Sequence, residues 1–238
     1  SFNGSFTILI NTIDEVITLP TIPDPTDIPA GPYFKIEANV GLTILGQTLS
    51  GDFALEQKTD ANDQLYVLIG FENVVLNLAD DPDDDPDLGG LIRVDLTSGI
   101  FVLTQTGLAG DVSASVTVRP ELNVGISGNL RLTVNTTGDL LNETITFDET
   151  TLELTLDAGP FVRVEISEVE LTIDQSVFSA LELVLEQQGA LVQFSGTDIS
   201  FSLQAGDCRI AGVQDADFAF ELSGAGIVGA VVNANLLG

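Results

Sequence analysis

Apolar and polar residues alternate along most of this chain with a period of two. Within residues 34–44, Phe34 and Ile36 fall on one side of the pattern, and Lys35 and Glu37 fall on the other. A period of two places successive side chains on opposite faces of a β-strand. The pattern predicts an all-β fold of about fifteen strands without a helix.

Several of the longer apolar patterns change phase midway. Val67, Ile69 and Phe71 occupy odd positions, whereas Val74 and Leu76 continue the pattern on even positions. A slip of one residue exchanges the two faces of a strand, so each change predicts a β-bulge or a strand that passes from one sheet to another. Long antiparallel strands of this kind favour a β-sandwich-like or β-superhelical arrangement.

The chain also repeats itself. Residues 31–37 (GPYFKIE) return as residues 159–165 (GPFVRVE), and residues 3–12 correspond to residues 127–136. Self-similar β-rich chains are usually stacks of units that bury their faces against neighbours. We therefore expect two tandem repeats of about 120 residues each, open at both ends.

The repeat divides the chain into four parts. Residues 1–19 match the closing element of a preceding repeat, and four prolines make residues 20–30 a predicted linker. The first repeat spans residues 31–148, and the second, incomplete repeat spans residues 149–238. We expect a head-to-tail continuation, either within a longer tandem polypeptide or between separate subunits by β-augmentation. An ordinary two-domain protein that begins within the pattern is the alternative.

The expected assembly contacts are apolar residues near the two ends of this pattern. In this interpretation, the first strand supplies the element that the second repeat lacks, because an unpaired apolar edge favours association. The residues are Phe2, Phe6, Ile8, Ile10, Phe218, Phe220 and Val232.

Charge narrows the possible partners. The chain has seven cations, 36 acidic residues and a formal net charge of −29. Nucleic acid and anionic membrane surfaces would repel such a chain. Since no apolar run is long enough to cross a bilayer, we also expect no membrane insertion. Salt screens this charge, which favours an extracellular or cell-surface location, and we interpret the protein as prokaryotic. The single Cys208 provides no disulfide framework.

One acidic run has the composition of a metal-binding loop. Residues 80–87 (DDPDDDPD) contain six carboxylates, and alternating oxygen ligands suit calcium. The candidate ligands are Asp81, Asp83, Asp85 and Asp87, although the glycine and glutamate of an EF-hand are missing. A solvated acidic loop is the alternative, because the sequence of residues 204–207, at the corresponding place in the second repeat, predicts only a short turn. Calcium is the only cofactor that the sequence suggests.

Catalytic chemistry has few candidate residues. The chain contains no His, so it has neither a Ser-His nor a Cys-His pair. Paired carboxylates such as Glu165 and Glu168 could serve a glycosidase, but the chain has no Trp and two Tyr. Glu165 beside Arg163 is more typical of a charge pair on a solvated face. We expect no catalytic residues and no enzymatic activity.

Three segments resemble a known group of proteins. Residues 42–57, 107–110 and 128–137 are similar to repeats of very large bacterial extracellular proteins, which are often grouped with RTX-type adhesins. The resemblance implies a secreted or surface-anchored fibre of tandem all-β units. It carries over no catalytic residues, and the nonapeptide calcium repeats of that group are missing from this chain.

Two functions follow from these expectations. The first is a non-enzymatic structural subunit or repeat of an extracellular filament, which binds copies of itself head to tail by strand complementation or chain continuity. The second is a calcium-dependent adhesin module that binds a surface glycan or protein. Chelation separates them, because strand pairing does not require calcium.

Overall fold

A computed structural model describes residues 2–19, 26–44, 47–59, 64–78, 92–118, 124–147, 150–205 and 208–237. All regular elements within these ranges are β-strands, which confirms the all-β prediction. Residues 179–188, whose composition also allows a helix, belong to strand β13. The described ranges contain seventeen strands, close to the number expected from the alternation.

The strand bounds are as follows. The first group is β1 (Phe2–Asn11), β2 (Ile17–Leu19), β3 (Thr26–Ile28), β4 (Tyr33–Ile44), β5 (Gln47–Thr59), β6 (Leu65–Leu78), β7 (Ile92–Leu103), β8 (Leu108–Val118) and β9 (Val124–Asn135). The second group is β10 (Leu141–Phe147), β11 (Thr150–Leu156), β12 (Phe161–Ile173), β13 (Ser176–Gln188), β14 (Leu191–Ala205), β15 (Cys208–Ser223), β16 (Gly226–Val232) and β17 (Asn235–Leu237).

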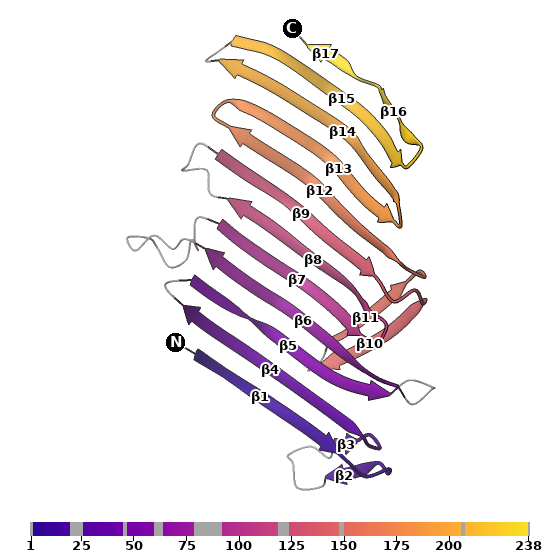
Figure 1. The fold of residues 1–238 in the computed structure, drawn as a ribbon. Helices are drawn as coiled ribbons and strands as arrows, with labels where there is room; N and C mark the ends of the chain where they lie inside the picture. Colours follow the sequence, from indigo (N-terminus) through magenta and orange to yellow (C-terminus); the bar gives the residue numbers. More distant parts are fainter. Residues whose placement is uncertain are drawn as a thin grey trace.

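Thirteen strands form one antiparallel sheet, and the chain visits them almost in sequence order (Figure 1). The order is β1-β4-β5-β6-β7-β8-β9-β12-β13-β14-β15-β16, with β17 also paired to β15. Two small hairpins, β2–β3 and β10–β11, interrupt this order. Strand β3 lies within the segment that the prolines predicted to be a linker.

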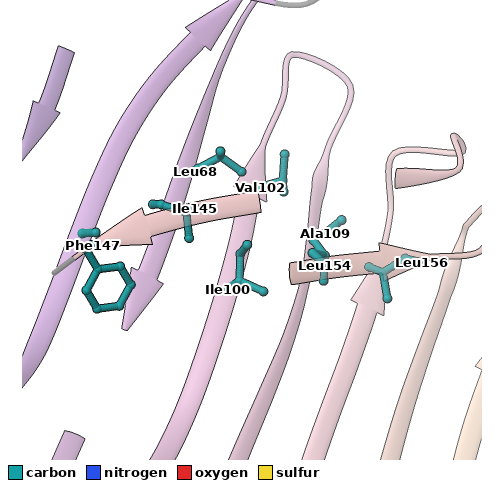
Figure 2. Packing of buried hydrophobic residues seen from close by; sticks show 9 residues of the cluster. Leu68, Ile100, Val102, Ala109, Ile145, Phe147, Leu154 and Leu156 are labelled. Carbon is teal, nitrogen blue, oxygen red and sulfur yellow. The ribbon is translucent and has the colours of Figure 1, made fainter. Parts of the chain in front are cut away.

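The hydrophobic core lies between the large sheet and the β10–β11 hairpin, which crosses several of its strands (Figure 2). Ile145 and Leu154 of the hairpin are each 1% exposed, and Leu68 and Val102 of the sheet are 0% and 1% exposed. Gly70 lies opposite the hairpin, where an added Cβ would be 2.8 Å from Ile145 Cγ2. The hairpin therefore forms a local second layer over this part of the sheet, whereas thirteen strands form a single sheet and not the predicted repeating sandwich or superhelical units.

The phase changes in the sequence correspond to β-bulges. Asn73 of β6 and Glu168 of β12 have φ angles of 51° and 53°, and the pairing register of β12 with β9 shifts between Ser167 and Glu170. Val74 and Leu76, beyond the bulge in β6, remain on the same side as Phe71, because Leu76 pairs with Leu49. Each bulge thus keeps the apolar side chains on one face instead of transferring the strand to another sheet.

One face of the large sheet is consequently apolar from edge to edge. We call it the apolar face, and the opposite face, which carries β10–β11, the polar face. A single row of paired residues across the apolar face contains no polar side chain. The row is Phe6, Ala38, Phe53, Phe71, Gly99, Val112, Leu132, Val164, Leu185, Phe194, Phe220 and Gly229.

Candidate assembly surfaces

The chain crosses from one strand to the next through a hairpin at two places that are built alike. Strand β1 leads through β2–β3 into β4, and β9 leads through β10–β11 into β12. At the first crossing, Asn11 ends β1, and its Nδ2 donates hydrogen bonds to the carbonyl oxygens of Glu15 and Pro29 at 2.8 and 2.7 Å. Asn11 is 5% exposed, so these bonds hold both ends of the crossing together.

Asn135 repeats this arrangement at the second crossing. Its Nδ2 donates to the carbonyl oxygens of Asp139 and Asp157, each at 2.8 Å, and its side chain is fully buried. Its Oδ1 accepts hydrogen bonds from the backbone N–H and the hydroxyl of Thr137. The same residue type therefore closes both crossings with the same donor pattern.

A glycine follows each crossing because the backbone approaches the asparagine closely. An added Cβ on Gly31 would lie 2.3 Å from the carbonyl oxygen of Asn11, and one on Gly159 would lie 2.3 Å from that of Asn135. The peptide bonds Gly31-Pro32 and Gly159-Pro160 are both cis. The repeated Gly-Pro of the sequence thus occupies equivalent positions in the two crossings.

The N-terminal edge of the sheet is β1, which pairs with β4 (Figure 1). Three of the predicted assembly residues, Phe6, Ile8 and Ile10, lie on its apolar face and are 73%, 46% and 57% exposed. Phe2 is also in β1, opposite Leu42 in register. An edge strand with exposed apolar side chains favours pairing with another strand.

The other predicted assembly residues lie at the opposite end of the sheet and are not all at its edge. Phe218 and Phe220 belong to β15, one strand inward, and the Phe218 ring lies 4.7 Å from that of Phe194 and 5.7 Å from that of Phe220. Val232 belongs to the edge strand β16 and is 52% exposed. It pairs with Asp217 and so lies on the polar face, away from the two phenylalanines.

Strand β16 has a counterpart inside the sheet. A Cβ on Gly229 of β16 would lie 2.1 Å from Cδ1 of Phe220, and a Cβ on Gly110 of β8 would lie 2.2 Å from Cδ1 of Phe101. In both strands the aromatic ring of the preceding strand lies over a glycine. Strand β8 pairs with β9 on its other side, whereas β16 is the end of the strand order.

An ion-pair network crosses the polar face beside the core. Arg131 contacts Asp111 at 2.6 Å and Glu165 at 3.9 Å, and Arg163 contacts Glu165 at 2.8 Å and Glu186 at 3.9 Å. The sequence predicted the pairing of Glu165 with Arg163. Arg131 donates hydrogen bonds to the Asp111 carboxylate, and these bonds raise the pKa of its guanidinium.

Glu165 therefore forms ion pairs with two cations, Arg131 and Arg163. Glu168, the second carboxylate considered for catalysis, lies at the bulge of β12 and accepts a hydrogen bond from Asn129 at 3.0 Å. A hollow of about 240 Å³ beside the network is lined by Arg163 and Phe161, among others. The arrangement is that of a structural charge network, since each carboxylate in it is bound to a cation.

Two lysines join the hairpin to the polar face. Lys35 donates to the carbonyl oxygen of Thr146 and contacts Glu37 at 2.7 Å. Lys58 donates to the carbonyl oxygen of Thr144 at 2.9 Å. Both acceptors belong to β10, so the ammonium groups satisfy backbone carbonyls of the hairpin. Residues far apart in sequence form these contacts, and the alternation alone provided no signal for them.

Tyr33 is a titratable group whose pKa the fold shifts strongly. Burial raises the pKa of its phenol, and the neighbouring carboxylate of Glu56 raises it further. At the other end of the sheet, a hydrogen bond from Asn233 lowers the pKa of Asp217, and the backbone N–H of Asp198 adds to this effect. Neither group belongs to a cluster with a nucleophile.

The predicted calcium ligands Asp81, Asp83, Asp85 and Asp87 lie outside the described residues. Within the described ranges, no group of three or more acidic, His or Cys residues could hold a metal ion. Those ranges also contain no helix long and apolar enough to cross a membrane. Calcium binding remains a prediction from the sequence.

Comparisons with known proteins add no relative to this description: no protein family, no curated protein and no solved structure matches the chain.

Proposed function

We propose that this chain is a non-enzymatic structural subunit or repeat of an extracellular filament or surface fibre. Copies join head to tail, with β16 of one unit pairing with β1 of the next. The two segments that begin at the Gly-Pro pairs act as tandem repeats, and the second is completed by its neighbour. The same pairing serves separate subunits and consecutive units of one longer polypeptide.

One observation carries this proposal: β1 and β9 lead into the same Asn and Gly-Pro crossing, but among the described strands only β9 has a pairing partner on its other side. That strand is β8, whose counterpart is β16 by the matching glycine and aromatic contacts. An antiparallel edge pair restores to β1 the environment that β9 already has.

The pairing of β8 with β9 fixes the register of the proposed joint. Gly110 pairs with Val134, one residue before Asn135. Gly229 of one copy would therefore lie opposite Ile10 of the next, one residue before Asn11. In this register Val231 lies opposite Ile8, and both side chains are on the apolar face, 58% and 46% exposed. The joint would cover both.

The correspondence between β16 and β8 also explains why a valine on the polar face is exposed. Val228 of β16 is the counterpart of Ala109 of β8. Ala109 is 0% exposed because it belongs to the core at the β10–β11 hairpin, whereas Val228 is 75% exposed. In the proposed joint, the β2–β3 crossing of the next copy would lie near Val228. Ile13 and Val16, 57% and 61% exposed, flank that crossing and could cover it.

Addition of the first strand in trans tests the joint. A synthetic peptide of residues 1–12 should bind β16 of the terminal unit and shorten fibres, because it supplies the pairing strand without a following sheet. The matched control is the same peptide with Phe6→Asp and Ile8→Asp, which carries charge on the apolar face. Fibre length is measured by electron microscopy.

Deletion of residues 2–11 is a second test of the head-to-tail joint. The shortened chain should keep the core at β10–β11 and its cooperative unfolding, but should no longer form fibres. Fibres of unchanged length after this deletion, or an equal effect of both peptides, would refute the joint. Fibres that dissolve in EDTA would instead favour the calcium-dependent adhesin module.

A further inference from the structure

The apolar face of the large sheet exposes many apolar side chains that the head-to-tail joint does not cover. Leu185 and Phe194, in β13 and β14 toward the C-terminal end of the sheet, are 45% and 40% exposed, and Phe6 in the edge strand β1 is 73% exposed. The total accessible surface is 14385 Å². A compact protein of 25.1 kDa exposes roughly 10,300 Å². The difference of about 4,000 Å² reflects the open, mostly single-layered sheet, both faces of which contribute to the accessible surface.

The apolar face is also flat, because several of its largest side chains lie over glycines. The rings of Phe71, Phe101 and Phe220 lie over glycines of the adjacent strands. A Cβ on Gly99, for example, would fall 2.1 Å from Cζ of Phe71. Large side chains therefore fill the gaps beside them instead of projecting from the sheet. Such a surface fits another sheet face more closely than it fits an irregular partner.

The described ion pairs lie away from the apolar face. The ion pairs of Lys35, Arg93, Arg131 and Arg163 all lie on the polar face, and Glu168 and other acidic residues lie at the bulges. With a net charge of −29, two copies repel each other over long distances. Contact through the apolar faces keeps the charged faces outward and as far apart as two sheets allow.

We infer that two copies of this chain pack their apolar faces together and form a two-layered β-sandwich. A stable interface needs about 800 Å² from each partner, and the apolar face extends across the twelve successive strands from β1 to β16. The contact is isologous, so each copy presents the same rows of side chains to the other. The inference does not depend on the head-to-tail joint, which uses the strand edges and not the face.

A charge placed on each face in turn tests the pairing in the full-length chain. Leu185→Arg on the apolar face should weaken self-association at least about tenfold, because it buries an unpaired charge. The matched control is Thr197→Arg, an exposed position in β14 on the polar face, which should associate like the unchanged chain. Sedimentation equilibrium gives both constants, and circular dichroism checks that each variant is folded. Higher salt should strengthen association of the unchanged chain.

Thiol labelling keeps the inference testable if Leu185→Arg does not fold. In a Cys208→Ser background, Ile126→Cys lies on the apolar face and Thr197→Cys on the polar face. Pairing predicts that a maleimide labels Ile126→Cys at least tenfold more slowly at concentrations above the dimer constant, and at a similar rate after dilution to the monomer.

Three results would overturn the inference. The first is a chain that remains monomeric at every concentration. The second is equal weakening by both arginine variants. The third is a monomer that floats with phosphatidylcholine vesicles, which would assign the apolar face to lipid. An unchanged chain that forms dimers but no fibres would count against the head-to-tail joint alone.

Discussion

The two crossings differ in what lies between their matching ends. Asn11 with Gly31 and Asn135 with Gly159 form the same hydrogen-bonded frame. The first frame encloses strands of three residues, and the second encloses strands of seven. Only the longer hairpin contributes to the described core cluster. The frame therefore specifies where the chain turns, and the hairpin length determines how much of the sheet is covered.

Removal of a buried side chain should give the largest difference in stability between the two hairpins. Leu154→Ala in β11 should cost about 2–5 kcal/mol, because it leaves a cavity between two layers. Ile28→Ala in β3 should cost less than about 2 kcal/mol, since Ile28 is buried but lies outside the core cluster. Chemical denaturation followed by circular dichroism measures both. Equal losses would show that the short hairpin covers the sheet as well as the long one.

Substitution of the two asparagines should have the next largest effect. Asn135→Ala removes four hydrogen bonds at a fully buried position and should cost roughly 2–4 kcal/mol. Asn11→Ala removes three and should cost roughly 2–3 kcal/mol. Hydrogen exchange should show general loss of protection in Asn135→Ala and loss limited to β1 in Asn11→Ala. The reverse distribution would contradict the assignment of the core to the second crossing.

Lys58, which joins the long hairpin to the sheet, should contribute less to the free energy of unfolding. Lys58→Met removes the donor to Thr144 and should cost about 1 kcal/mol, because the side chain is partly exposed. In the short hairpin, an exposed hydrogen bond from Thr18 to Asp27 joins its own two strands. Thr18→Val should change the free energy of unfolding by less than about 0.5 kcal/mol. A larger effect for Thr18→Val would reverse the comparison.

The smallest difference should appear only at alkaline pH. Tyr33 and Phe161 occupy equivalent positions after the two Gly-Pro pairs, and only Tyr33 titrates. Its pKa is raised in the folded state, so its neutral form is favoured there. The stabilisation is complete below the unfolded tyrosine pKa of about 10 and is lost as pH rises through the folded pKa. Tyr33→Phe should remove this loss in alkaline thermal melts, and an unchanged pH profile would contradict it.

Much of the local structure could be predicted from the sequence. The alternation gave the strands, and the phase change after Phe71 gave the bulge at Asn73. The matched Gly-Pro pairs marked two equivalent crossings. These features depend on neighbours in sequence, so a periodic pattern contains them.

The arrangement of the layers could not be predicted in the same way. A phase change does not say whether a strand changes sheets, and only the register of Leu76 with Leu49 shows that the face is kept. Nor does alternation reveal that β10 lies against Lys35 and Lys58, because those contacts join distant segments. Phe218 and Phe220 were expected at an edge, but β16 lies outside them.

Cryo-electron microscopy of the assembled protein tests the head-to-tail joint most directly. The joint predicts a continuous thread in which β16 of one unit pairs with β1 of the next and Gly229 lies opposite Ile10. Separate particles at every concentration, or threads in which either edge strand faces solvent, would contradict it.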